Sequence, residues 1–319
     1  MFQSVLICVH LWLVSVISVL SVGFFSLDIV LYFLSSLMEM SSNFDLDFGR
    51  FNLKLSERTH IMGVLNVTPD SFSDGGLYID KNEAVDRALT MVEEGVDIID
   101  VGGESTRPGA KPVPLNEELK RVIPVIDAIA PEIKVPVSID TYKSEVAEEA
   151  ISAGASMVNE ISGLRFDEKM GKVLSNADIP VVIMHIKGTP RDMQVNPQYT
   201  DLIGEIKEYL DRQTEFAQKN GIDKTIIDPG IGFGKKHEDN LVILKRLDEF
   251  KSIRRPILVG PSRKSFIGYV LDLPVEERLE GTLAACAVAI LNGANILRVH
   301  DVRETVRVTR LVDAVRNAE

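Results

Sequence analysis

The 319-residue sequence contains little cysteine and no long basic segment. Cys8 and Cys286 are its only cysteines, which excludes a disulfide scaffold and any zinc or iron–sulfur site built on cysteine. Since the formal net charge is −12 and no run is rich in Lys and Arg, nucleic acids and anionic membrane surfaces are excluded as main partners. With 45% hydrophobic and 26% charged residues, the chain is not disordered. The low cysteine content suits a reducing compartment, so we expect a cytoplasmic protein.

Lys and Arg are absent from the first 49 positions, and that part of the chain is also unusually apolar. Between residues 5 and 37, 24 of 33 residues are apolar and Asp28 carries the only formal charge. A helix over residues 5–25 would be ~31 Å long, which is sufficient to cross a bilayer core. A signal peptide normally begins with basic residues, and membrane orientation depends on flanking Lys and Arg, yet the first basic residue here is Arg50.

Three interpretations of this segment follow. It is a membrane anchor, an uncleaved targeting segment, or a stretch translated from upstream of a true start at Met38 or Met40. We favour the third interpretation because the chain has the composition of an ordinary soluble protein directly after Met40. We therefore divide the chain into a hydrophobic segment, residues 1–43, and a globular domain, residues 44–319. A membrane is expected as a partner only if residues 1–37 are genuine.

From residue 60 onward, short β-branched runs alternate with amphipathic stretches. Eight strands are predicted, at residues 61–68, 97–101, 135–140, 157–161, 180–185, 225–228, 256–260 and 296–300. Helical patterns lie between them at residues 82–94, 115–130, 143–153, 202–220, 240–250, 275–292 and 303–318. The strands are continuously apolar, as in parallel sheets that are covered on both faces. The repeat predicts an α/β fold of the (β/α)8 TIM-barrel class, with residues 48–58 as a lead-in hairpin that closes the bottom of the barrel.

Polar side chains gather at the predicted carboxyl ends of the strands, where a barrel of this kind forms its active site. These residues are Asn66, Asp100, Asp140, Asn159, Met184–His185, Asp228, Ser262–Lys264, Arg298 and His300. A single Asp at a strand end is more often a helix cap or a turn residue than a ligand. Because unpartnered buried carboxylates are costly, several in one mouth imply a ligand that is rich in hydrogen-bond donors.

The types of these residues suggest what that ligand is. A 2-amino-4-oxo pyrimidine edge presents adjacent N–H donors that a carboxylate accepts side by side, and an amide supplies a complementary donor and acceptor. Asp140, Asn159 and Asp228 could converge on such an edge. Arg298 and His300 suit an anion such as pyrophosphate, and Asn66 with Asp100 could help to hold a hard cation that bridges it.

Two long segments resemble the signature loops of the dihydropteroate synthase family: residues 63–76 (GVLNVTPDSFSDGG) and residues 100–110 (DVGGESTRPGA). Shorter matches follow in the family's order at residues 138–141, 184–185, 188–190, 228–235, 262–265 and 298–302. The resemblance covers about residues 50–319. It implies a transferase of folate biosynthesis that joins 6-hydroxymethyl-7,8-dihydropterin diphosphate to 4-aminobenzoate and releases pyrophosphate. It also implies Mg²⁺ as cofactor and a homodimer.

The resemblance assigns roles to individual positions. It implies that the pterin is bound by Asp140, Asn159, Asp228 and Lys264, with Arg298 over one ring face and Met184 over the other. Asn66 is implied to help bind Mg²⁺ and pyrophosphate, with Asp100, Arg298 and His300 near the diphosphate. The aminobenzoate pocket is implied to contain Thr106, Arg107, Pro108, Phe233, Ser262 and Lys264, with Phe72 and Asp74 closing over it. Asp100, Thr106, Arg107, Lys264, Arg298 and His300 form the implied catalytic set.

Three alternative functions stay open at this point. A pterin-dependent methyltransferase shares the pterin pocket, although it does not need the Ser-Thr-Arg-Pro-Gly loop at residues 105–109. A Schiff-base aldolase would use Lys264 as its nucleophile. A non-catalytic pterin-binding barrel, or one tethered to a membrane, is a third alternative. His185 lies near the expected mouth, and its role is left open.

Overall fold

A computed structural model describes residues 44–68 and 81–318. Residues 44–319 form one unit by their internal contacts. The hydrophobic segment at residues 1–43 and the first-loop residues Phe72 and Asp74 lie outside the described residues. Within the described part of the chain, no helix is both long and apolar enough to cross a membrane.

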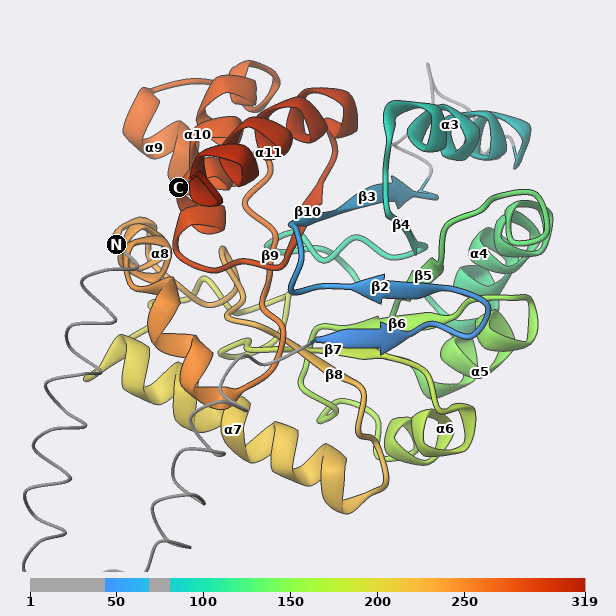
Figure 1. The fold of residues 1–319 in the computed structure, drawn as a ribbon. Coiled ribbons are helices and arrows are strands. Elements are labelled where there is room, and N and C mark those ends of the chain that lie inside the picture. The colour runs from blue at the N-terminus through green and yellow to red at the C-terminus, as the bar shows by residue number, and fades with distance from the viewer. Residues whose placement is uncertain (1–43, 69–80, 319) are drawn as a thin grey trace, which may run out of the picture. The chain divides into compact units, whose positions relative to one another are not determined.

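Eight parallel strands form the predicted barrel (Figure 1). They are β3 (His60–Asn66), β4 (Ile98–Gly102), β5 (Val137–Asp140), β6 (Met157–Glu160), β7 (Val181–Met184), β8 (Thr225–Asp228), β9 (Leu258–Val259) and β10 (Ile296–Val299). Their order in the sheet is β8-β7-β6-β5-β4-β3-β10-β9. A parallel bridge between Ile227 in β8 and Ile257, just before β9, joins the two ends of the sheet. The (β/α)8 fold class is therefore confirmed.

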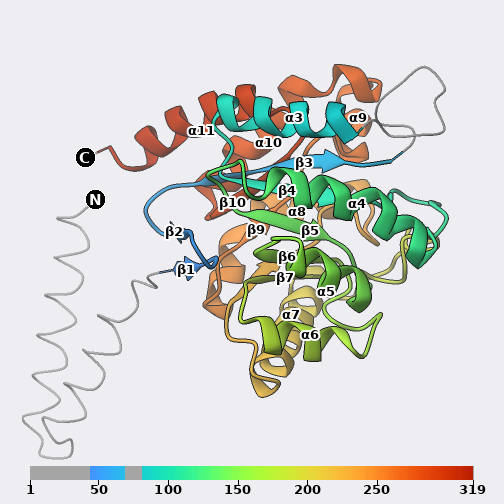
Figure 2. The ribbon, with the colours of Figure 1, turned by 90° about the vertical axis from the view of Figure 1, so that its right-hand side faces the viewer.

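Helices cover the outside of the strands, as two views at right angles show (Figures 1 and 2). They are α3 (Lys81–Glu94), α4 (Leu115–Ile129), α5 (Ser144–Ser152), α6 (Met170–Ala177), α7 (Leu202–Lys219), α8 (His237–Lys245), α9 (Ser265–Leu271), α10 (Leu279–Leu291) and α11 (Val302–Arg316), with 3₁₀ helices η1 (Leu247–Ile253) and η2 (Val275–Glu277). The main core lies between the two layers, where Leu65 of β3 and Met91 of α3, for example, belong to one buried cluster. Burial on both faces explains why the strands are apolar throughout.

The sequence prediction missed two helices and misplaced two boundaries. Both α6 and α9 are short, so neither shows a full helical period in the sequence. The predicted helix at 275–292 is divided at Arg278, whose side chain donates to the carbonyl oxygens of Leu273 and Arg263 and so stabilises a turn. The predicted helix at 240–250 begins three residues earlier, at His237, and continues into η1 after Arg246.

The lead-in segment closes the amino-terminal end of the barrel, but its hairpin begins before the predicted residues 48–58, at Asp45. Strands β1 (Asp45–Asp47) and β2 (Asn52–Lys54) form an antiparallel hairpin. Phe48 in its turn and Leu55 just after it are 0% and 1% exposed. Their partners are the first inward-facing side chains of seven barrel strands: Met62, Ile98, Met157, Val182, Ile226, Leu258 and Ile296. The apolar floor leaves the opposite end of the barrel for polar residues.

Candidate active site

The polar residues stand directly above this apolar floor because side chains on one face of a strand repeat every second residue. Two residues beyond the floor positions, the same strands present Asp100, Asn159, Met184, Asp228 and Arg298. Two residues further come Asn66, Ser262 and His300, at or just beyond the strand ends. Strand β5 adds Asp140 at its last position. The strand register thus brings residues that are far apart in the sequence together, in two polar layers at one end of the barrel.

These layers surround a pocket that opens at the carboxyl end of the barrel. The pocket is lined by Val64, Thr106, Asp140, Asn159, Ile161, Met184, Asp228, Ile231, Phe233, Gly260, Ser262, Lys264, Arg298 and His300. Ten of these are residues that the sequence singled out. The sequence reasoning missed Val64, Ile161, Ile231 and Gly260, three of which are apolar. For Val64, Ile161 and Gly260, the two-residue alternation along each strand was the signal that could have found them.

Arg298 is the electrostatic centre of the pocket. Its Nε donates to Asp100 Oδ2 and its Nη2 donates to Asp140 Oδ2, each at 2.6 Å. Both carboxylates are buried, Asp100 completely. Burial raises the pKa of Asp140, as does the neighbouring Asp100, and Arg298 opposes that rise. Because the two ion pairs lead to two different carboxylates, they fix the orientation of the guanidinium plane of Arg298 in the pocket.

Asp100 lies beneath the pocket rather than in its lining, and it orients Asn159. Asn159 Nδ2 donates to Asp100 Oδ2 at 3.0 Å, which leaves Asn159 Oδ1 as the amide's available acceptor. Among residues 44–68 and 81–318, no group donates a hydrogen bond to buried Asp100 Oδ1. A buried carboxylate oxygen without a partner is costly, and the two hydrogen bonds to Asp100 Oδ2, from Asn159 and Arg298, offset part of that cost.

Asp228 begins the loop that follows β8. It is buried, and its Oδ1 accepts a hydrogen bond from the Gly230 N–H at 2.7 Å. Gly230 has φ +72°, and a Cβ there would lie 1.9 Å from the carbonyl oxygen of His185, so only glycine fits. Burial raises the pKa of Asp228 to about 6, against the opposing effects of the Gly230 N–H and Lys264.

Lys264 lies opposite Asp228 and against an aromatic ring. Its Nζ is 4.2 Å from the centroid of the Phe233 ring, a cation–π arrangement. Burial and the nearby Arg298 lower the pKa of Lys264 to about 8, so the ammonium form still predominates at pH 7. A charged Lys264 beside the acceptor Asp228 supports recognition of a polar ring.

His300 differs from the cationic group that the sequence suggested. Burial and the adjacent Arg298 lower its pKa to about 4, so the imidazole is neutral at pH 7. Ser262 Oγ accepts from the His300 backbone N–H at 3.3 Å and lies 3.0 Å from His300 Nδ1. The neutral imidazole carries one N–H, and its Nδ1 and the Ser262 hydroxyl share one hydrogen bond. His300 is therefore a neutral polar group, and Arg298 supplies the positive charge.

Besides Asp100, four residues that the sequence singled out lie outside the pocket lining. Asn66, at the end of β3, is partly exposed near Asp140. Arg107 and Pro108 are exposed on the second loop, although Arg107 is close enough to lower the pKa of Lys264. His185, whose role the sequence left open, is buried away from the lining, with its Nδ1 2.9 Å from Lys235 Nζ. Burial lowers the pKa of Lys235 to about 7.

Comparisons with known proteins agree with this geometry. The family described as pterin binding enzymes matches residues 62–300. The dihydropteroate synthase of Synechocystis sp. is 47% identical over 273 residues, which are 85% of this chain and 94% of that protein. A structure of Xanthomonas albilineans dihydropteroate synthase with 4-aminobenzoic acid has a TM-score of 0.82 at 41% identity, covering 87% of this chain and all of that one. Another, in complex with 7,8-dihydropteroate, has a TM-score of 0.78 at 38% identity, covering 86% and 100%.

The chain therefore belongs to the family of pterin-binding enzymes, on a (β/α)8 barrel. Its activity is that of a dihydropteroate synthase, a transferase of folate biosynthesis, which joins a pterin diphosphate to 4-aminobenzoate. The similarity favours this activity over the methyltransferase, the aldolase and the non-catalytic barrel.

Proposed function

We propose that the pocket binds 6-hydroxymethyl-7,8-dihydropterin diphosphate with the pyrimidine edge of its ring at the bottom. Asp228 offers a carboxylate, and Asn159 Oδ1 a neutral acceptor, to the adjacent N–H donors of that edge. Asp140 and Lys264 complete the polar contacts, and Met184 contacts one ring face. The observation that carries this proposal is the convergence of these five side chains, from four strands and one loop, on one cavity.

In the proposed reaction, the bond from the pterin methylene carbon to the diphosphate oxygen breaks, and a bond to the amine of 4-aminobenzoate forms. Arg298, held by two carboxylates, and the neutral ring of His300 stabilise the negative charge that develops on the departing diphosphate. The electron-rich dihydropterin ring can stabilise positive charge on the methylene carbon. The amine attacks as a neutral NH₂ group and its nitrogen gives up one proton to the departing pyrophosphate, so no strong base is needed. Apolar lining by Ile161 and Ile231 helps to exclude water, which would compete for that carbon.

We also propose Mg²⁺ as the cofactor, and the oxygen donors at the rim fit this ion. A Cβ placed on Gly102 would lie 3.9 Å from Asn66 Oδ1, so this amide oxygen, a hard ligand, borders the space above Gly102. Within residues 44–68 and 81–318, no cluster of three acidic, His or Cys side chains could hold a metal alone. This suits Mg²⁺, which commonly binds through one or two protein oxygens together with substrate phosphates. Bound there, the ion would neutralise diphosphate charge, and loss of activity on chelation with recovery on adding Mg²⁺ tests this.

The second loop is proposed to bind 4-aminobenzoate through Thr106, which lines the pocket, and Arg107, which lies near Lys264. Arg107→Ala is expected to raise the KM for 4-aminobenzoate about tenfold or more, because a charged hydrogen bond to the carboxylate is lost. The dissociation constant of the pterin diphosphate should stay within about twofold of the wild-type value, because the pterin contacts are untouched. Steady-state kinetics measures the KM and calorimetry measures the dissociation constant. An unchanged KM would show that Arg107 does not bind 4-aminobenzoate.

A homodimer is proposed from the apolar surface of α9 and α10. Tyr269, Val270 and Leu271 are 58%, 55% and 45% exposed, and Val288 and Leu291 on α10 are 43% and 56% exposed. Helix α10 carries a single charged residue and is apolar on both its inner and outer faces, which indicates that the outer face packs against a partner. Sedimentation of the full chain should give twice the monomer mass, and a monomer at micromolar concentration would contradict this proposal.

We propose that residues 44–319 are the catalytic domain, that residues 1–43 are a separate hydrophobic segment, and that the enzyme is cytoplasmic. The support is that every pocket residue falls within residues 62–300, the range that matches the family. Amino-terminal sequencing of the native protein decides whether residues 1–43 are present, and fractionation of cells locates the enzyme.

A further inference from the structure

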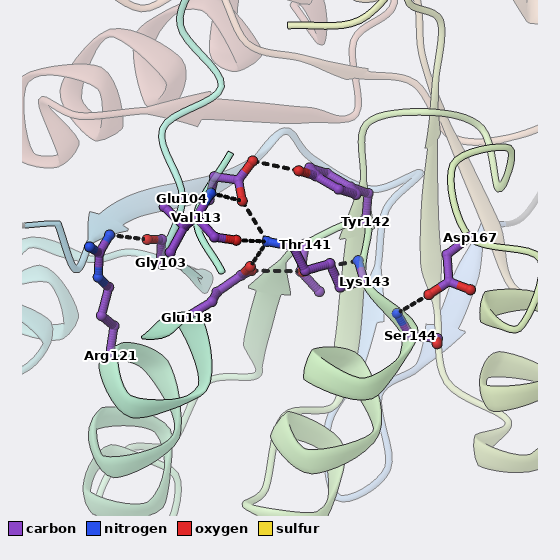
Figure 3. A network of polar contacts seen from close by, with 10 residues as sticks. All are labelled: Gly103, Glu104, Val113, Glu118, Arg121, Thr141, Tyr142, Lys143, Ser144 and Asp167. Carbon is purple, nitrogen blue, oxygen red and sulfur yellow. Dashed lines mark hydrogen bonds and ion pairs between the residues drawn. The ribbon is translucent and has the colours of Figure 1, made fainter. Parts of the chain in front are cut away.

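The second loop is closed at its base by one carboxylate. Glu104 precedes the loop at residues 105–112, and Val113 follows it. Glu104 Oε2 accepts hydrogen bonds from the Val113 backbone N–H at 3.0 Å and from Lys143 Nζ at 2.5 Å (Figure 3). The side chain of Glu104 is 7% exposed, so these contacts are shielded from water. The two ends of the loop are therefore joined to each other and to Lys143.

Lys143 is at the centre of this network. Besides Glu104, its Nζ donates to the Val113 carbonyl oxygen at 2.8 Å and to Glu118 Oε2 of α4. An ammonium group has three donors, and here each has a different acceptor. Glu118 is 1% exposed, and it also accepts a hydrogen bond from Thr141 Oγ1 at 2.8 Å. All three donors of the Lys143 ammonium group are thus used in structural contacts, and Lys143 does not line the pocket.

The network also connects the loop to the pterin side of the site. Lys143 lies three residues after Asp140, and the intervening Tyr142 donates its hydroxyl to Glu104 Oε1 at 2.6 Å. On the other side of the loop base, Arg121 of α4 donates to the Gly103 carbonyl oxygen at 2.8 Å. One short segment after β5 therefore carries both a pterin carboxylate and the anchor of the second loop.

We propose that Lys143, together with Glu104 and Glu118, is a positioning residue that sets Thr106 and Arg107 over the pterin pocket for capture of 4-aminobenzoate. This inference rests on the proposed role of the second loop. Without Lys143, Glu104 and Glu118 would face each other without a cation, and the base of the loop would open. Misplacement of a substrate-binding group by about 1 Å is sufficient to slow a reaction by up to about a hundredfold. The pocket residues that we assign to the pterin would keep all of their own contacts.

The test compares Lys143→Met with Lys169→Met in the full chain. Lys169 is a matched control because it is also a lysine paired with a glutamate, Glu145 at 3.2 Å, but its side chain is 75% exposed. Lys143→Met is expected to raise the KM for 4-aminobenzoate about tenfold or more and to lower kcat, with the dissociation constant for pterin diphosphate within about twofold of wild type. Lys169→Met should match the wild type in all three. Equal KM values for the two variants would overturn the inference.

A second variant covers the case in which Lys143→Met does not fold. Glu104→Gln keeps the size of the side chain and one acceptor oxygen but removes the charge that pairs with Lys143. Its KM for 4-aminobenzoate should rise by about threefold or more, with pterin binding retained, and an unchanged KM would refute the inference. Arg107→Ala distinguishes failure of the positioning role of Lys143 from failure of the proposed role of the second loop. If it raises KM and neither network variant does, only the positioning role fails, whereas no effect of Arg107→Ala rejects the loop's proposed role itself.

Discussion

Asp228→Asn is expected to weaken pterin binding by about a hundredfold or more while the barrel stays folded. The amide keeps one oxygen for the Gly230 N–H, which Asp228 Oδ1 accepts at 2.7 Å, so the loop after β8 retains its geometry. It replaces the other carboxylate oxygen by an NH₂ group that opposes an N–H donor of the ring. Loss of a charged hydrogen bond costs about 1.5–3 kcal/mol, and the unsatisfied donors add about 1–3 kcal/mol.

Calorimetry with 6-hydroxymethylpterin, which lacks the diphosphate, measures this effect without interference from phosphate ionisation. Thermal unfolding of the same sample shows whether the variant is folded. A dissociation constant within threefold of the wild-type value would show that Asp228 does not contact the ring.

The same ligand reveals the titration of Asp228. Because burial raises the pKa of this carboxyl to about 6, its ionised form is lost as pH falls from 7 to 5. The part of the wild-type affinity that depends on Asp228 should therefore be constant above pH 7 and fall toward a tenfold loss per pH unit well below pH 6. Asp140, whose pKa burial raises to about 7, and Lys264, with a pKa of about 8, add pH dependence of their own that both proteins share. Asp228→Asn should lose the component of this pH dependence that comes from residue 228. An identical profile for the two proteins would assign the titration to another group.

Much of the site could be predicted from the sequence because a parallel barrel imposes a simple rule. Strand ends meet at one edge, and alternate residues face inward, so Asp140, Asn159 and Asp228 had to converge once eight strands were recognised. The helices were less predictable where they were short. Nothing in the spacing of α6 or α9 distinguishes them from loops, and the segments on both sides of α9 are held by tertiary contacts of Arg278.

The sequence could not predict which side chains pair with each other. A strand pattern gives the direction of a side chain but not its partner, so it could not show that Arg298 joins Asp100 to Asp140. The neutral state of His300 depends on burial and on the adjacent guanidinium, and both arise only in the folded chain. The network around Lys143 joins residues up to 39 positions apart, and none of them lies in the pocket lining.

Arg298→Met is expected to destabilise the fold as well as to abolish measurable synthase activity. Removing one partner of a buried ion pair costs about 3–5 kcal/mol because the remaining charge has no compensation. Here a single guanidinium compensates two carboxylates, Asp100 at 0% and Asp140 at 8% exposure. Arg298→Lys keeps the charge but cannot donate along both directions at once, so it should recover more stability than activity. Chemical denaturation at pH 7 measures the loss, and a midpoint equal to that of the wild type would contradict the ion-pair assignment.

The destabilisation by Arg298→Met should also depend on pH in a defined direction. Burial raises the folded-state pKa of Asp140 above the unfolded value of about 3.9, and without the guanidinium nothing from Arg298 opposes that rise. The unfolded state then binds fewer protons than the folded state between these values, so the free energy of unfolding falls as pH rises through that window. The variant should therefore be closest to wild-type stability near pH 5 and furthest from it near pH 8. Asp140→Asn in the Arg298→Met background removes one of the two charges and should restore part of the stability at pH 8, whereas no recovery would place the lost energy in packing around the side chain of Arg298.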